Sequence, residues 1–238
     1  MQINDLETSA EPAAGPPPSA LQRTVSRSLE RRRALYEAEV ERLVRAAFEL
    51  IRRTGDLEPR VSEIVSQAGM CNQAFYKHFR SKRELLVAVL DEGNRLLAGY
   101  LQHRMDRSSD PLERIREWLR GILEQALNPE AAESTRPFVV SRGRLAEAFP
   151  DEVVASERQI TALVRESIAA AAESGRLPHA DPERDAETLY HLAMGWLQER
   201  LRPSPADTAA NARDAERVVE FALAGLRRSG GESTWSAR

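Results

Sequence analysis

The chain is poor in cysteine and lysine and has no long apolar run. Cys71 is the only cysteine among 238 residues, so no intrachain disulfide can form, which is typical of a reducing compartment. No apolar run approaches the roughly 20 residues that a membrane-spanning helix needs. The first residues are acidic and lack the apolar centre of a secretory signal. These absences favour a cytoplasmic protein, and a hydrophobic content of 42% with 30% charged residues is ordinary for a globular one.

The short motifs that carry enzymatic chemistry are absent from the sequence as well. It contains no glycine-rich phosphate loop, no His-Glu-x-x-His and no Gly-x-Ser-x-Gly. The four histidines lie far apart and lack the spacing of metal ligands. A zinc site from His179, Asp181 and Glu183 is conceivable, but ordinary helix-start chemistry explains that run better. We therefore expect no enzyme, no cofactor and no metal site.

Basic residues are concentrated near the N-terminus. Between Gln22 and Arg83 the chain has 14 basic and eight acidic residues, whereas the remainder has 20 basic and 29 acidic ones. Both lysines of the chain, Lys77 and Lys82, lie in this basic segment. The alternative is that charges are scattered this way by chance. A basic segment joined to an acidic remainder is typical of a nucleic-acid-binding domain beside a second domain.

Composition and periodicity divide the chain into four parts. The first 20 residues are rich in proline, alanine, serine and glutamate, which predicts disorder. Five arginines follow before residue 34, either as an arm that reaches a DNA groove or as a charged helical lead-in. We expect a disordered extension with a basic arm over 1–34, a DNA-binding domain over 35–83, an effector-binding and dimerisation domain over 84–228, and a flexible tail over 229–238.

Nearly all of the chain between these termini has the apolar period of helices, and no stretch alternates as a strand would. Start signals are a capping side chain before proline at residues 110–111, 181–182 and 204–205, and Ser81 followed by Glu84. The sequence predicts an all-α fold of about nine helices: one from about Val40 to Thr54, then Val61–Ala68, Asn72–His78, Ser81–Tyr100, one after Pro111, Phe138–Ala148, Asp151–Ser174, Glu183–Leu201 and Ala206–Arg228.

The second and third of these helices form a helix-turn-helix. Gly69 lies at the tight turn between them, where a residue without Cβ avoids a clash. Ile64, Val65, Phe75 and Phe79 are expected to hold both helices against Phe48 and Ile51 of the first helix. The second helix of such a motif enters the major groove of DNA. Its remaining polar side chains then face outward to read DNA.

This segment resembles the TetR family of bacterial regulators over about Leu43–Leu90. The residues that carry the resemblance are Gly55, Val61, Ile64, Ala68-Gly69, Phe75-Tyr76, Phe79, Ser81-Lys82, Glu84 and Leu85-Leu86. The resemblance implies a homodimer, usually a repressor, that leaves a short palindromic operator when an effector binds the C-terminal domain. Two positions depart from the family, which usually has Thr at Arg60 and Ser or Thr at Cys71. Asn72 is the alternative cap for the helix that follows Cys71.

The predicted DNA contacts follow from side-chain chemistry. Tyr76, Lys77, His78 and Lys82 suit phosphates, as does the charge of Arg60, while Asn72 and Gln73 can bond base edges in pairs. Ala74 is small enough to approach the groove or a thymine methyl, although it could equally pack inside. The candidate set is Arg60, Ser62, Asn72, Gln73, Ala74, Tyr76, Lys77, His78 and Lys82. Cys71 is either a redox-sensitive thiol or, with stronger reason, a small semi-apolar residue.

An effector site is expected among apolar and aromatic residues of the C-terminal helices, with a few polar groups among them. The candidates are Trp118, Ile122, Phe138, Arg142, Phe149, Tyr190, Met194 and Trp196, each of which could instead be ordinary core or surface. The last two helices have apolar stripes wide enough for an intersubunit four-helix bundle. Two other functions stay open: a DNA-binding regulator controlled by protein contact and, more remotely, an all-α enzyme or ligand carrier.

Overall fold

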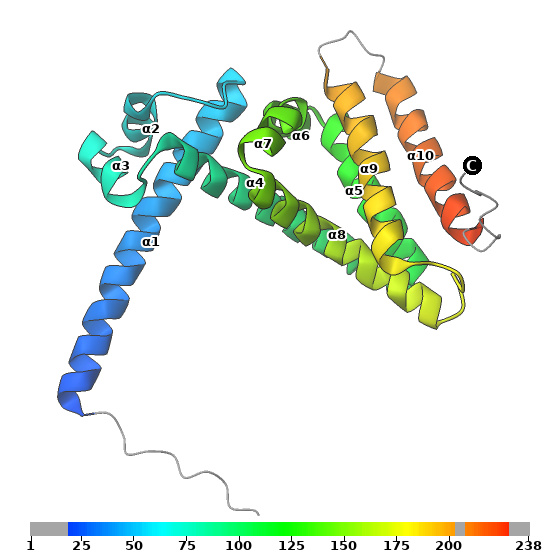
Figure 1. Cartoon of the computed structure of the whole chain (residues 1–238), viewed down its shortest axis with the longest axis horizontal. Helices are drawn as coiled ribbons and strands as arrows, with labels where there is room; N and C mark the ends of the chain where they lie inside the picture. The colour runs from blue at the N-terminus through cyan, green and yellow to red at the C-terminus, as the bar shows by residue number, and fades with distance from the viewer. Residues whose placement is uncertain (1–18, 203–207, 229–238) are drawn as a thin grey trace, which may run out of the picture. The chain divides into compact units, whose positions relative to one another are not determined.

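A computed structural model of the chain describes residues 19–202 and 208–228 (Figure 1). These residues form ten helices and no strand, which confirms an all-α fold with an N-terminal helix-turn-helix domain and a larger C-terminal helical domain. The chain divides into two units, one that ends at Glu41 and one that begins at Arg42. The helices are α1 Ala20–Thr54, α2 Val61–Ala68, α3 Asn72–His78, α4 Lys82–Met105, α5 Pro111–Leu127, α6 Pro129–Val140, α7 Arg142–Ala148, α8 Pro150–Glu173, α9 Pro182–Leu201 and α10 Thr208–Arg228.

Helix α1 begins at Ala20, so residues 20–34 are a charged helical lead-in, one of the two alternatives, and are not part of a disordered extension. No glycine or proline interrupts the chain between Ala20 and Gly55, and arginine, leucine and glutamate favour helix. The helix start is capped reciprocally. The Ser19 hydroxyl accepts from Gln22 N at 3.2 Å, and the Gln22 side chain accepts from Ser19 N at 2.7 Å. Residues 1–18, the start signal at 204–205 and the expected tail at 229–238 lie outside the described residues.

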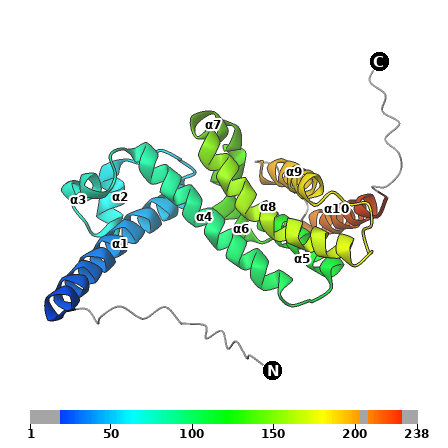
Figure 2. The ribbon, with the colours of Figure 1, turned by 60° about the horizontal axis from the view of Figure 1, so that its bottom comes forward.

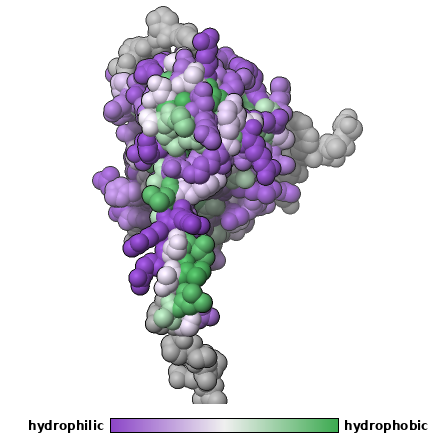
Figure 3. All heavy atoms as spheres, turned by 90° about the vertical axis from the view of Figure 1, so that its left-hand side faces the viewer, coloured by the Kyte–Doolittle hydropathy of each residue, from purple (hydrophilic) through white to green (hydrophobic). Residues whose placement is uncertain are grey.

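The part of α1 up to Glu41 carries apolar side chains that face solvent. Leu21, Val25 and Leu29 recur every four residues and are 74%, 49% and 59% exposed. Figure 3 shows such apolar atoms in green beside hydrophilic ones along this part of α1. Four-residue spacing places the three side chains on one face of the helix.

In the second unit, the helix-turn-helix has its own buried side chains. Ile64 and Val65 of α2 and Phe75 of α3 are almost fully buried, as is Phe79 directly after α3. These residues were predicted to hold the motif together. Phe48 behaves differently, because it is only half-buried and stacks on Phe138, with 5.7 Å between the ring centroids. Helix α1 therefore packs both against the helix-turn-helix, through Ile51, and against Phe138 of α6, through Phe48.

The C-terminal domain is arranged around α5, which contacts α4, α6, α8, α9 and α10 (Figure 2). Its core includes Trp118 and Ile122 of α5 and Val164 and Ile168 of α8, all essentially without exposed surface. Trp118 donates its indole N–H to the carbonyl of Ile160 at 3.1 Å. This hydrogen bond satisfies the one polar atom of a large buried side chain.

Helix α6 accounts for the tenth helix. The sequence predicts a single helix over Phe138–Ala148, whereas the chain breaks at Ser141 between α6 and α7. Asn128 caps α6, accepting from Glu130 N at 2.9 Å and Ala131 N at 3.1 Å. This is the same Asx-Pro start as at residues 110–111. Pro137 inside the helix and its polar composition obscured the apolar period that marked the other helices.

The fold makes a prediction about two glycines. Gly69 has φ +64°, so a Gly69→Ala substitution should lower the free energy of unfolding by about 1–2 kcal/mol. Gly99 lies inside α4 with open space around its Cα, so Gly99→Ala should raise it by about 0.5–1 kcal/mol. Urea unfolding measures both variants. Equal effects of the two substitutions would contradict the left-handed turn at Gly69.

Candidate functional site

The turn of the helix-turn-helix is held by backbone and side-chain hydrogen bonds. The Gly69 N–H donates to Ser66 O at 3.2 Å and the Met70 N–H to Val65 O at 2.8 Å. From α1, the Arg42 guanidinium donates to Ala68 O at 2.5 Å. A cation at the C-terminal end of α2 satisfies an otherwise free carbonyl and matches the helix dipole. Sequence analysis missed Arg42, because its partner is 26 residues away.

The N-terminal ends of α2 and α3 are capped in ways that the resemblance did not predict. Arg60 makes no side-chain cap, and instead the Glu63 carboxylate accepts from Arg60 N at 3.0 Å. Helix α3 has Cys71 at its N-cap, with no side-chain hydrogen bond. Asn72 is the first helical residue, so the alternative that Asn72 caps α3 is wrong.

Most candidate DNA contacts are exposed. These are Arg60, Ser62, Asn72, Gln73, Tyr76, Lys77 and Lys82. Ala74 and His78 are half-buried, and His78 lies in the last turn of α3, next to the buried Phe79. The Tyr76 ring is 65% exposed, and its edge packs against Phe75 with 5.1 Å between centroids. This contact orients the ring while leaving its hydroxyl end accessible.

Lys82 begins α4 beside the helix-turn-helix. Ser81 caps the helix by accepting from Glu84 N at 3.2 Å, as its sequence pattern predicts. The Glu84 carboxylate accepts from Arg80 N at 2.7 Å. The Lys82 ammonium lies 3.4 Å from the carbonyl of Glu58, in the segment before α2. Lys82 is therefore exposed and held near the start of α2.

A second candidate site is a cavity of about 720 Å³ in the C-terminal domain. Its walls come from α4, α5, α6, α7, α8 and α9, with Phe48, Glu49 and Arg52 of α1 at one side. A volume of this size suits a drug-sized molecule. Five of the sequence-predicted effector residues line it: Ile122, Phe138, Arg142, Tyr190 and Met194.

The other three candidates lie elsewhere. Trp118 is in the core, hydrogen-bonded as described, and does not line the cavity. Trp196 is half-buried on α9 with the Arg200 guanidinium 5.4 Å from its ring centroid. Phe149 lines a smaller cavity of about 450 Å³, where the Arg83 guanidinium lies 4.6 Å from its ring centroid. The helical spacing of aromatic residues is the same whether they fill the core or line a cavity. The sequence alone therefore could not exclude these three residues from the effector site.

One wall of the larger cavity carries a polar triad. Arg142 Nη2 pairs with the Glu157 carboxylate, and the Tyr190 phenol lies close enough to both groups for their charges to influence its pKa. Burial, reinforced by the Glu157 charge, raises the pKa of Tyr190 to about 12, so its phenol stays protonated at neutral pH. The Arg142 Nε is buried and has no hydrogen-bond partner among the described residues.

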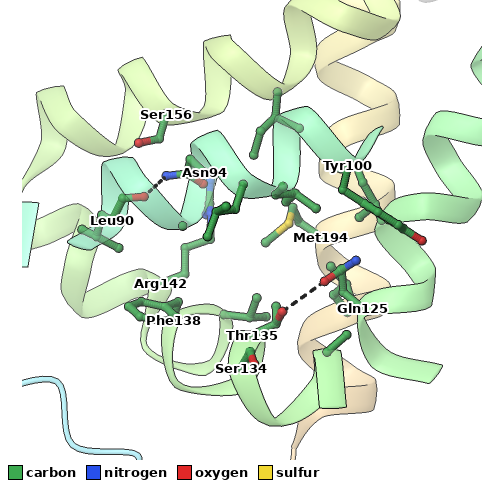
Figure 4. Close-up of a pocket in the computed structure, with 18 of the residues that line it drawn as sticks. Leu90, Asn94, Tyr100, Gln125, Ser134, Thr135, Phe138, Arg142, Ser156 and Met194 are labelled. Carbon is green, nitrogen blue, oxygen red and sulfur yellow. Dashed lines mark hydrogen bonds between the residues drawn. The ribbon is translucent and has the colours of Figure 1, made fainter. Parts of the chain in front are cut away.

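Further polar groups line the cavity, and Figure 4 shows them around Phe138 and Met194. Asn94 donates to Leu90 O at 2.8 Å, within α4. Thr135 of α6 donates to the Gln125 side chain at 3.4 Å. Sequence analysis missed Thr135 because it missed α6, and missed Asn94 because a polar residue in a long helix reads as surface.

The comparisons with known proteins identify the domain that contains the helix-turn-helix. Residues 43–89 match the model of the bacterial regulatory proteins of the tetR family. A solved TetR-family regulator of Pectobacterium atrosepticum is 26% identical, covering 82% of this chain and 96% of its own, with a TM-score of 0.66. Residues 43–89 are therefore a DNA-binding domain of the TetR type.

Two further solved structures share the fold. AibR, in complex with isovaleryl coenzyme A and operator DNA, is 18% identical, covers 80% of this chain and 98% of its own, and has a TM-score of 0.54. RolR, in complex with resorcinol, is 20% identical, covers 84% of this chain and 96% of its own, and has a TM-score of 0.60. None of the curated proteins compared matches the chain in sequence.

The TetR assignment makes this chain a DNA-binding transcriptional regulator. Within the described residues, no helix has the length and apolar character to cross a bilayer. No group of three or more histidine, cysteine or acidic side chains in this part of the chain could hold a metal ion. The exposed side chains of α3 and the start of α4 are therefore the groups to test against DNA.

Lys82 provides that test. Lys82→Ala should weaken binding to every duplex similarly, because a phosphate contact carries no base information. The slope of log affinity against log salt concentration should become shallower by about 0.9 for each phosphate that the protein no longer neutralises. Salt titrations of fluorescence anisotropy measure both effects. Arg158→Ala, on the exposed face of α8, is the control. An unchanged salt slope for Lys82→Ala would remove Lys82 from the DNA interface.

Proposed function

We propose that this TetR-family regulator is a homodimeric cytoplasmic repressor that leaves a palindromic operator when a small effector fills the larger cavity. The observation that carries the proposal is that two helices, α4 and α7, each lead from the lining of the larger cavity to the start of α4 near Lys82. Helix α4 starts at Lys82 and lines the cavity with Leu90, Asn94 and Leu97. Helix α7 begins in the cavity wall at Arg142 and leads to Phe149, which packs against Arg83.

The contact at Arg83 offers a route from effector to DNA. The Arg83 guanidinium donates to the carbonyl of Ala148 and lies over the Phe149 ring, one residue from Lys82. A ligand that displaces Arg142 would shift the short α7, because a helix of seven residues moves as one body. Its far end would then pull on the first turn of α4. An effector that prefers the shifted form by ~3 kcal/mol lowers operator affinity roughly a hundredfold.

Dimerisation is proposed through α9 and α10. Phe221 of α10 is 72% exposed, the second-highest exposure among the large apolar side chains that the structure describes. Val218 on the same helix and Trp196 on α9 are only partly buried. Burying such side chains in a two-fold interface would remove apolar surface from water. Two recognition helices could then enter successive major grooves about 34 Å apart.

The solved relatives support an effector without identifying it. AibR was solved with isovaleryl coenzyme A and operator DNA, and RolR with resorcinol. The cavity of about 720 Å³ favours an effector over control by protein contact alone. A catalytic function is not proposed for the chain, since the described lining of its cavity holds no pairing of a nucleophile with a histidine base.

The test begins with operator fragments that the full chain selects from genomic DNA. Transcription from a promoter that contains the operator should fall when the chain is added and recover with a small-molecule fraction of the host cell. Phe149→Leu should keep the effector-free operator affinity but reduce the effector-dependent loss about tenfold, because the contact at Arg83 is weakened. Activation of transcription would overturn repression. Release by no small-molecule fraction would favour the protein-contact alternative.

The dimer interface has its own prediction. Phe221→Glu should convert the dimer to monomers, because a charge cannot be buried in an apolar interface without a partner. Sedimentation velocity measures the mass, and operator affinity should fall at least about a hundredfold once the two half-sites are no longer read together. Val140→Glu, at another apolar position that is 51% exposed, is the matched control. A dimeric Phe221→Glu variant would refute this interface.

A further inference from the structure

Most charged side chains of the larger cavity are paired. Six of them line it: Glu49, Arg52, Glu124, Glu130, Arg142 and Glu157. Carboxylates thus outnumber guanidinium groups, and no lysine or histidine lines the described cavity. Arg52 is 3.0 Å from Glu49 and 3.2 Å from Glu133. Arg142 pairs with Glu157. Each cation of the wall already has a carboxylate beside it.

Two of the carboxylates, Glu124 and Glu157, are also satisfied from within the protein, whereas Glu130 is exposed and has no ion pair among the described residues. The Tyr100 hydroxyl donates to Glu124 at 2.6 Å, and Arg104 pairs with the same carboxylate. Glu157 accepts from Arg142 and is mostly buried. An anionic ligand would therefore meet acidic groups without a free cation to hold it. A cationic ligand would have to separate pairs that are already formed.

The cavity nevertheless has an unused donor. The Arg142 Nε is buried without a hydrogen-bond partner among the described residues, and buried donors are normally paired. Figure 4 shows Arg142 reaching from its helix into the space near Asn94, with the apolar Phe138 and Met194 nearby. The Tyr190 hydroxyl is protonated at the same wall. A ligand oxygen that accepts from Arg142 would complete this cluster.

We infer that the cavity takes an uncharged, largely apolar ligand with one acceptor oxygen, such as a hydroxyl, phenol or carbonyl group, seated at Arg142. The inference rests on the proposed function only in calling this ligand the effector. Glu157 disfavours an anionic ligand, because its carboxylate neutralises the Arg142 guanidinium that would otherwise attract an anion. A carboxylate, and still more the several phosphate charges of a coenzyme A thioester, would be repelled by the acidic wall.

Ligands with one apolar chain and different head groups test the inference directly. Nile red, which is uncharged and carries a carbonyl oxygen, serves as the fluorescent probe bound to the full-length chain without DNA. Dodecan-1-ol should displace it at concentrations at least about tenfold lower than dodecanoate, and dodecanoyl coenzyme A should be weaker still. Displacement by either anion at equal or lower concentrations overturns the inference. So does a failure of Nile red and all three ligands to bind.

A substitution at Glu157 is expected to increase the affinity for an anionic ligand. Glu157→Gln keeps the side-chain shape but frees the Arg142 charge, so dodecanoate should bind about tenfold more tightly. Dodecan-1-ol should change by less than about twofold, since its hydroxyl needs only the donor. Glu147→Gln, exposed on α7, is the control and should change neither. Unchanged dodecanoate affinity in Glu157→Gln overturns the role of Glu157.

Binding and regulation are read separately in these experiments. The displacement assay contains no operator, so its result concerns only the chemistry of the cavity. If the head-group order holds and no small-molecule fraction releases the operator, the ligand class stands and effector control fails. If a charged metabolite releases the operator and displaces Nile red more tightly than dodecan-1-ol, effector control stands and the inferred ligand class fails.

Discussion

The continuity of α4 is the constraint on which the rest of the structure depends. Leu85, Leu86 and Val89 in its first turns line the same small cavity as Ile51 and Ile64 of the DNA-binding domain. Leu101 and Met105 near its end are fully buried in the C-terminal core. Since α4 has no break between Lys82 and Met105, a displacement of one end is passed along the helix to the other. The start of α4 beside the helix-turn-helix and the part of α4 that lines the larger cavity therefore belong to one continuous helix.

Many charged side chains inside the C-terminal domain form ion pairs. Arg104 of α4 pairs with Glu117 and Glu124 of α5, and Arg142 pairs with Glu157. Such partly buried pairs add specificity more than stability, because desolvation offsets much of their attraction. In the cavity they leave a polar surface on which each guanidinium charge is already offset by a carboxylate.

Much of the DNA-binding domain was predictable because its determinants are local. The turn at Gly69, the buried Phe75 and the Ser81 cap each depend on residues within a few positions, and the structure has them as expected. Errors arose where a partner is distant or a signal is polar. Arg42 acts on a carbonyl 26 residues away, and α6 has an Asn-Pro start without an apolar stripe.

By itself the sequence determined the class of this protein, since the helical periods, the turn glycine and the spacing of Tyr76, Phe79 and Lys82 are properties of neighbouring residues. Only the tertiary structure decided which aromatic side chains line a cavity and which fill the core. Trp118 and Tyr190 have similar helical surroundings in sequence, yet only Tyr190 reaches the cavity. That difference depends on how separate helices pack, and packing brings together residues, such as Arg142 and Tyr190, that no local pattern connects.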